Sequence, residues 1–296
     1  MANLIMHEVP EMDFPLMVVC FAGWPDAAEA ATGGVRYLVE KLGAKKFAEI
    51  DPEEFYDFSV VRPNVELDSE GNRSITWPSN DFYYSTSNEN SPGVILYIGT
   101  EPNLKWRAFL KNLMSLTGQF NVELVVSLGA LLDAVPHTRD TSITGRASSP
   151  ELLKQLELLG LQNSTYEGPT GIHTAFMDAC IKRNVPHVSI WGHVPHYVNS
   201  SPNPKVSHAL LEVLTGFVDL SVDLDDMKEA GRKFVHEVSQ VIDEQVDVKS
   251  YVSRLEKRYD DVQIPSGEVP SHDSMIEELE DFLKSQRPNS EEIDGS

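Results

Sequence analysis

The chain has 296 residues, of which 41% are hydrophobic and 24% are charged, and its formal net charge at pH 7 is −22. This length can bury a sizeable core, and the composition is typical of a globular protein. The negative charge argues against nucleic acids and anionic membranes as partners, because both repel an acidic surface. Residues 262–296 hold nine acidic and two basic residues. We interpret them as an acidic, largely disordered tail, which serves solubility or binds a basic partner surface.

Three features of the sequence predict a cytoplasmic protein. No apolar run approaches the roughly 18–20 residues that span a bilayer. The N-terminus lacks the basic segment of a signal peptide. The two cysteines, Cys20 and Cys180, lie inside apolar segments, which indicates reduced thiols packed in a core.

Apolar runs and helical patterns alternate along the first two thirds of the chain. Runs rich in β-branched residues predict buried strands at 16–22, 94–98, 122–132 and 187–191. Amphipathic segments predict helices at 27–42, 104–120, 150–159, 170–184 and 205–217, with Ser148 or Ser149, Thr170 and Asn203 as start signals. A hairpin at 64–77 and an additional edge strand at 81–84 interrupt the alternation. We therefore predict an α/β fold, a three-layer α/β/α sandwich with a mixed, mainly parallel sheet.

The chain divides into three parts by composition. Residues 1–219 should form the α/β/α core. Residues 220–261 are helical in pattern and should form an extension that packs on the core, with a break near residues 245–249. Residues 262–296 are the acidic tail, in which residues 275–283 could form one acidic helix.

Polar residues follow the predicted strands at their carboxyl ends, where open α/β sheets bind ligands. The loops concerned are 23–26, 99–103, 134–140, 167–173 and 192–197. If these loops converge on one edge, they should bring together Asp26, Glu101, His137, Arg139, His173 and His196. Such a group could supply a cleft with an acid, a base and a cation.

Each of these residues also has a simpler structural explanation. Asp26 is most simply a helix cap, and Glu101 could be one as well. Arg139 could pair with Asp133 or Asp140 within its own loop. The histidines lack metal-ligand spacing, and the chain contains no Gly-x-Ser-x-Gly or Gly-x-Gly-x-x-Gly motif. We therefore assign no catalytic residue, no metal and no cofactor.

Several motifs in these loops resemble the proteasome assembly chaperone 2 (PAC2) family. They begin with Phe21-Ala22-Gly23-Trp24-Pro25-Asp26 and continue in residues 101–106, 129–132, 135–139, 166–171, 194–197 and 203–205. The overall form is similar to the actinobacterial branch of that family, over about residues 18–260. The resemblance implies a fold like that of nucleoside phosphorylases, a homo-oligomer such as a trimer, and a chaperone-like or scaffolding role. It implies no established catalysis.

We therefore predict a non-enzymatic, proteasome-assembly-chaperone-like binding or scaffolding protein with a proteasome-related partner. The alternative is a small-molecule-binding protein or a phosphorylase/hydrolase-like enzyme with a cleft at the carboxyl ends of the strands. A third possibility is that the motifs stabilise oligomer contacts. The candidate cleft or ligand-binding residues are Gly23, Trp24, Asp26, Glu101, Trp106, His137, Thr138, Arg139, Gly168, Thr170, Gly171, His196 and Tyr197. An enzyme should gather Asp26, Glu101, His137 and Arg139 in an open cleft, whereas a binding protein should use such residues in caps and internal ion pairs.

Overall fold

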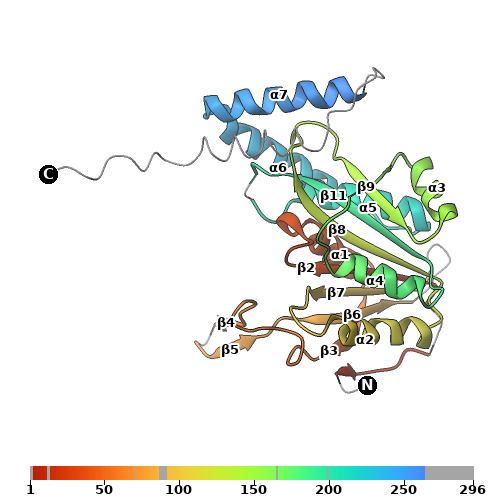
Figure 1. The fold of residues 1–296 in the computed structure, drawn as a ribbon. Helices are drawn as coiled ribbons and strands as arrows, with labels where there is room; N and C mark the ends of the chain where they lie inside the picture. Colours follow the sequence, from red (N-terminus) through yellow and green to blue (C-terminus); the bar gives the residue numbers. More distant parts are fainter. Residues whose placement is uncertain are drawn as a thin grey trace.

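The computed structural model describes residues 3–11, 14–69, 71–86, 92–164, 166–198 and 200–263. Within these ranges, a nine-stranded sheet has the order β1-β3-β6-β7-β2-β8-β11-β9-β10 (Figure 1). Its centre consists of four parallel strands, which are β7 (Val94–Thr100), β2 (Leu16–Ala22), β8 (Leu124–Asp133) and β11 (His187–Pro195). The four predicted central strands are thus confirmed, with β11 ending four residues later than expected.

Shorter strands extend the sheet on both sides. On one side β1 (Leu4–Met6), β3 (Lys45–Ile50) and β6 (Asn80–Ser85) are antiparallel. On the other side β9 (Ile143–Ala147) is antiparallel to β11, and β10 (Gln162–Asn163) is parallel to β9. The sheet is therefore mixed, as predicted. The prediction of residues 81–84 as an edge strand is wrong, because β6 pairs with β3 as well as with β7.

Helices cover both faces of the sheet and complete the three layers (Figure 1). One face carries α1 (Ala30–Lys41), α3 (Pro150–Leu158) and α5 (Pro204–Val218), and the other carries α2 (Trp106–Gln119) and α4 (Ile172–Ile181). Strand β2 shows why both faces are apolar. Its Val19 and Phe21 pack toward α2 and α4, whereas Val18 and Cys20 pack toward α1 and α5, since neighbouring strand residues point to opposite faces.

The predicted start signals of two helices are confirmed, and a third is wrong. The Ser149 hydroxyl accepts a hydrogen bond from the Leu152 amide and caps α3, and Asn203 caps α5 in the same way. Helix α4 begins at Ile172, and the side chain of Thr170 does not cap it. A carboxylate from a different loop takes that role, as described below.

Two helices follow the core, α6 (Asp225–Asp243) and α7 (Val246–Gln263). Helix α6 packs on α5, and the break between α6 and α7 lies where the sequence predicts it. The predicted helix at 275–283 and almost all of the tail lie outside the described residues. In the part of the chain that the structure describes, no helix has the length and apolar character needed to cross a membrane.

A separate hairpin is formed by β4 (Asn64–Leu67) and β5 (Arg73–Thr76), as predicted. All eight of its residues are exposed. Figure 1 shows it standing apart from the nine-stranded sheet. It therefore contributes little to the core and displays its side chains to solvent.

Candidate functional site

The parallel strands β2, β7, β8 and β11 all end at one edge of the sheet, which we call the carboxyl edge. Two of the predicted loops need correction. Residues 192–195 belong to β11 and not to the loop after it. The loop at 167–173 follows β10, outside the parallel centre, and it reaches the carboxyl edge because α4 begins there. The Glu101 carboxylate, which follows β7, accepts a hydrogen bond from the Ile172 amide at 2.7 Å.

The candidate residues at this edge fall into two separate groups. The open half lies at the ends of β2 and β7 and consists of Gly23, Trp24, Glu101, Trp106 and Gly171. The covered half lies at the ends of β8 and β11 and consists of His137, Thr138, Arg139, His196 and Tyr197. Gly168 and Thr170 lie in an exposed loop beside the open half. Asp26 belongs to neither group, because its carboxylate is directed at α1.

Asp26 is 6% exposed and serves the start of α1. Its Oδ1 accepts a hydrogen bond from the Ala31 amide at 2.7 Å, and its Oδ2 accepts one from the Thr32 hydroxyl. Burial raises the pKa of this carboxyl, and the hydrogen bonds from Thr32 and Ala31 oppose the rise. The carboxylate therefore works as a helix cap, which is the simpler of the two roles considered from the sequence.

In the open half, Glu101 and Trp24 close around Gly171. Besides accepting the Ile172 amide, Glu101 is half-buried, and burial raises its pKa while the hydrogen bond opposes the rise. A Cβ on Gly171 would lie 3.0 Å from Glu101 Oε1 and 3.1 Å from the ring of Trp24. Only glycine therefore fits here without displacing its neighbours. Trp24 itself is 69% exposed, and the Trp106 indole donates to the Pro102 carbonyl.

Gly23 makes the turn that follows β2. Its φ of +103° is one that residues with a side chain rarely adopt. The turn leads into a short 3₁₀ helix, η1 (Ala27–Glu29), in which Ala28 and Glu29 are left-handed. This unusual backbone holds Trp24 at the surface and Asp26 in the interior.

In the covered half, His137 is 3% exposed and is bound on both ring nitrogens. Its Nδ1 lies 2.8 Å from the Tyr197 hydroxyl, and its Nε2 lies 3.0 Å from the Ser239 hydroxyl of α6. Since Ser239 donates to the Val235 carbonyl, its oxygen accepts a hydrogen bond from the N–H at Nε2. Burial and the nearby charge of Lys205 lower the pKa of His137. This imidazole is therefore a neutral connector between the sheet edge and α6.

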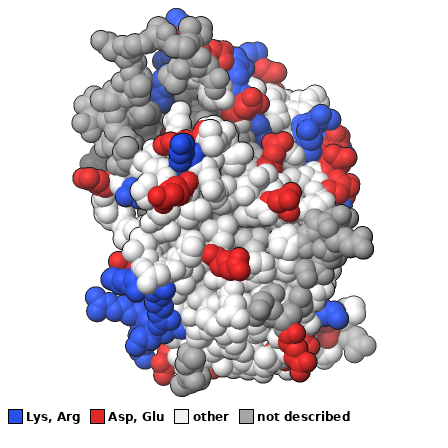
Figure 2. Space-filling view, turned by 90° about the vertical axis from the view of Figure 1, so that its right-hand side faces the viewer, with Lys and Arg blue, Asp and Glu red and all other residues white. Residues whose placement is uncertain are grey.

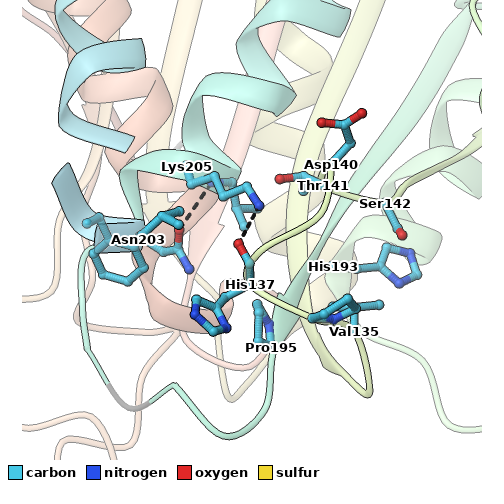
Figure 3. A pocket seen from close by; sticks show the side chains of 13 residues that line it. Val135, His137, Asp140, Thr141, Ser142, His193, Pro195, Asn203 and Lys205 are labelled. Carbon is cyan, nitrogen blue, oxygen red and sulfur yellow. Dashed lines mark hydrogen bonds between the residues drawn. The ribbon is translucent and has the colours of Figure 1, made fainter. Parts of the chain in front are cut away.

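Lys205, in the first turn of α5, binds the same loop. Its ammonium group donates to the His137 carbonyl at 2.6 Å (Figure 3). It also donates to the Arg139 carbonyl. Burial lowers the pKa of Lys205 to about 8. Lys205 belongs to the family motif at residues 203–205, and no local sequence pattern indicates that its side chain binds this loop.

Helix α7 binds the loop that carries Thr138 and Arg139. The Arg139 guanidinium forms two hydrogen bonds of 2.8 Å with the Asp260 carboxylate, and it also contacts Glu256, which accepts from the Thr138 hydroxyl as well. The predicted pairing of Arg139 with an acid of its own loop is therefore replaced by pairing with α7. The rings of His196 and Tyr197 pack edge-on against Tyr251 of the same helix.

The cavity within the covered half is small. It is lined by His137, His193, Asn203, Lys205, Val206 and Val235, among others (Figure 3). It offers about 10 Å³ for the centre of a water molecule, which is room for about one water. This cavity cannot hold a typical organic substrate.

His173 does not join either group. It is 2% exposed and packs between Phe21 and Trp191 in the core. Burial lowers its pKa to about 3. The predicted gathering of six polar residues in one cleft is therefore wrong, because Asp26 faces α1 and His173 faces the core.

These features define a class of protein, an α/β/α sandwich whose carboxyl-edge loops are fixed by caps and by two C-terminal helices. The sequence model of the PAC2 family matches residues 20–242. The chain therefore belongs to the PAC2 family, as its motifs suggested.

Solved structures of bacterial relatives agree with this assignment. A PAC2 family protein from Streptomyces avermitilis is 40% identical, with a TM-score of 0.73, over 80% of this chain and 99% of that one. The proteasome-assembly chaperone homologue of Mycobacterium tuberculosis is 37% identical, with the same TM-score and the same coverage. The archaeal proteasome activator PbaB of Pyrococcus furiosus shares the fold at a TM-score of 0.64 and 16% identity, over 81% of this chain and 98% of that one. No protein with a curated description matches the chain.

Proposed function

We propose that this protein is a proteasome-assembly-chaperone-like binding or scaffolding protein of the cytoplasm, whose partner is proteasome-related. The main support is the 37% identity to a proteasome-assembly chaperone homologue over nearly the whole length of that relative. Binding and scaffolding need no chemical step, so they fit a chain without a substrate-sized cavity among the covered-half residues.

The roles of the carboxyl-edge residues also support a binding protein. Asp26 and Glu101 cap helices, and Arg139 forms an internal ion pair with α7. Caps and internal ion pairs of this kind are what we expect of a binding protein, whereas an enzyme should gather the same residues in an open cleft. These contacts position loops and leave few polar groups to act on a substrate.

The hairpin of β4 and β5 offers a surface for a protein partner. Val65 lies opposite Ile75, and Leu67 lies two residues further along the same face. Their exposed fractions are 61%, 57% and 66%, respectively. An isolated two-stranded hairpin is only marginally stable in water, and a contiguous exposed apolar face usually marks an interaction site. We therefore place the partner contact on this apolar hairpin face.

Acidic charge forms no equally clear docking surface on the described residues of the side shown in Figure 2. Figure 2 shows one side of the molecule, on which acidic side chains are scattered and basic ones gather at the lower left. The acidic excess therefore does not form one continuous patch on that side. An apolar contact is the better supported mode of partner binding.

Native mass spectrometry of the full-length protein, purified gently from its own cells, tests the proposal. We expect a stoichiometric protein partner, proteasome subunits above all, and a homo-oligomer of this chain, with a trimer as the expected form. The triple variant Val65→Ser, Leu67→Ser, Ile75→Ser should lose the partner. Substitutions on the opposite face of the hairpin, Glu66→Gln and Ser74→Ala, should retain it. A protein recovered without any protein partner would count against the proposal.

A further inference from the structure

Three side chains at the carboxyl edge form a chain of hydrogen bonds that the proposed function does not use. His193 Nδ1 lies 2.7 Å from Asp133 Oδ2, and His193 Nε2 lies 3.0 Å from the Thr144 hydroxyl. Each residue comes from a different strand, because β11 lies between β8 and β9 in the sheet. Pairing of Pro195 with Asp133 and of Trp191 with Thr144 puts both partners on diagonal positions from His193, within reach of a long side chain.

The donors and acceptors in these two hydrogen bonds are ordered as they are around an activated hydroxyl. The Asp133 carboxylate can only accept, so the proton of a neutral His193 stays on Nδ1. Nε2 then carries a lone pair and accepts a hydrogen bond from the Thr144 hydroxyl. A carboxylate, an imidazole and a hydroxyl in this order are the parts of a nucleophile with its general base.

The carboxylate and the imidazole are held firmly in place. The Ala134 amide donates to Asp133 Oδ1 at 2.6 Å, and the His193 amide donates to the Ser142 carbonyl at 3.0 Å. Burial favours a higher pKa for Asp133, but the hydrogen bonds from His193 and Ala134 and the nearby charges of His193 and Arg258 together outweigh burial, and the pKa is lowered. Asp133 is therefore ionised at neutral pH and can stabilise an imidazolium.

A second imidazole–hydroxyl pair in the same sheet provides an internal comparison. His187 Nε2 lies 2.7 Å from the Ser127 hydroxyl, and both residues are fully buried. Its Nδ1 has no hydrogen-bond partner among the described residues. By contrast, the side chains of His193 and Asp133 are 14% and 32% exposed, and Thr144 is partly exposed as well. Only the pair with the carboxylate is open to solvent.

We propose that Thr144 is a nucleophile, with His193 as its general base and Asp133 orienting the base, and that it accepts acyl groups from small activated esters. The Thr144 oxygen bonds to the ester carbonyl carbon while its proton moves to His193 Nε2. The bond from that carbon to the leaving oxygen breaks, and the imidazolium returns the proton to the leaving group. Water then attacks the acyl-threonine, gives a proton to Nε2, and the Thr144 oxygen leaves and recovers that proton. The products are a carboxylic acid and an alcohol.

Incubation of the full-length protein with p-nitrophenyl acetate tests this site. We expect release of p-nitrophenolate and one acetyl group on Thr144, located by peptide mass spectrometry. Thr144→Val, which keeps the β-branched shape, should remove the adduct, and Thr144→Ser should keep an acetyl group on the residue at this position. His193→Gln should slow release about 10²- to 10⁴-fold. Ser127→Ala, in the buried pair, should leave the rate unchanged.

Other outcomes would overturn the proposal. An unchanged rate in Thr144→Val, acetylation confined to other residues such as lysines, or no release above the buffer rate would each show that Thr144 is not activated. Circular dichroism of each variant separates loss of reactivity from loss of the fold. The assay needs no protein partner, so its result is independent of the partner-binding test.

Discussion

The two halves of the carboxyl edge are stabilised in different ways. At the ends of β8 and β11, side chains from three helices hold the loops: Lys205 of α5, Ser239 of α6 and Asp260 of α7. At the ends of β2 and β7, a single carboxylate caps α4, and an exposed indole ring rests on Gly171. The covered half is a connected polar network, whereas the open half rests on a few local contacts.

This difference predicts different responses to substitution. Members of a buried polar network depend on one another, because removing one leaves its partners without hydrogen bonds. A solvent-exposed group can rearrange or bind water instead. The covered half should therefore be sensitive to substitution, while the open half should tolerate substitution and remain adaptable.

The largest effect should follow replacement of Lys205. Lys205→Met leaves the carbonyls of His137 and Arg139 without their donor and should lower the free energy of unfolding at neutral pH by about 2–3 kcal/mol. Urea denaturation measures this value. Lys228→Met, on the exposed surface of α6, serves as control and should change it by less than about 0.5 kcal/mol. Equal effects of the two substitutions would show that the network does not hold the loop.

The same residue should make stability depend on pH. Its pKa of about 8 in the folded protein is below the value of about 10.4 in an unfolded chain. Between these values the unfolded state binds more protons, so the contribution of Lys205 to stability rises as the pH increases from about 8 to about 10.4. The difference in unfolding free energy between the native protein and Lys205→Met should widen over this interval. A constant difference would contradict the depressed pKa.

Replacing two glycines, Gly129 of β8 and Gly171 of the open half, should change stability by intermediate and different amounts. A Cβ on Gly129 of β8 would lie 2.8 Å from the Trp191 ring, which donates a hydrogen bond to Ser189. Gly129→Ala should therefore cost about 1–3 kcal/mol. Gly171→Ala meets the ends of two partly exposed side chains, Glu101 and Trp24, which can shift toward solvent, and it should cost less than about 1 kcal/mol. Denaturation of both variants checks the order, and a larger cost at Gly171 would reverse the comparison.

The smallest effect should come from the contact between Arg139 and α7. The side chains of Arg139 and Asp260 are 34% and 50% exposed, and solvent screens exposed ion pairs. Asp260→Asn should leave global unfolding nearly unchanged but speed hydrogen exchange in α7 several-fold, since local opening needs less energy than global unfolding. Asp261→Asn, the next residue of the same helix, is the control. Unchanged exchange in Asp260→Asn would show that the pair of Arg139 with Asp260 does not hold α7.

Local patterns predicted much of the fold. The central strands are apolar runs, and their burial on both faces follows directly from that composition. Ser149 and Asn203 mark helix starts because their side chains bond to amides three residues later. The break between α6 and α7 also lies where the pattern predicts it. Errors arose where a distant segment decided the outcome. β3 covers the edge of β6, and Glu101 takes the capping role expected of Thr170.

The sequence alone determined the layers of the sandwich, the family and the edge of the sheet where polar loops gather. These properties depend on hydrophobic periodicity and on motifs within a few residues of one another. Only the tertiary structure decided the partners of these loops. Arg139 meets Asp260 across 121 residues, and Asp133, His193 and Thr144 meet because strand register aligns three strands. Such contacts depend on how whole elements pack, which no local pattern specifies.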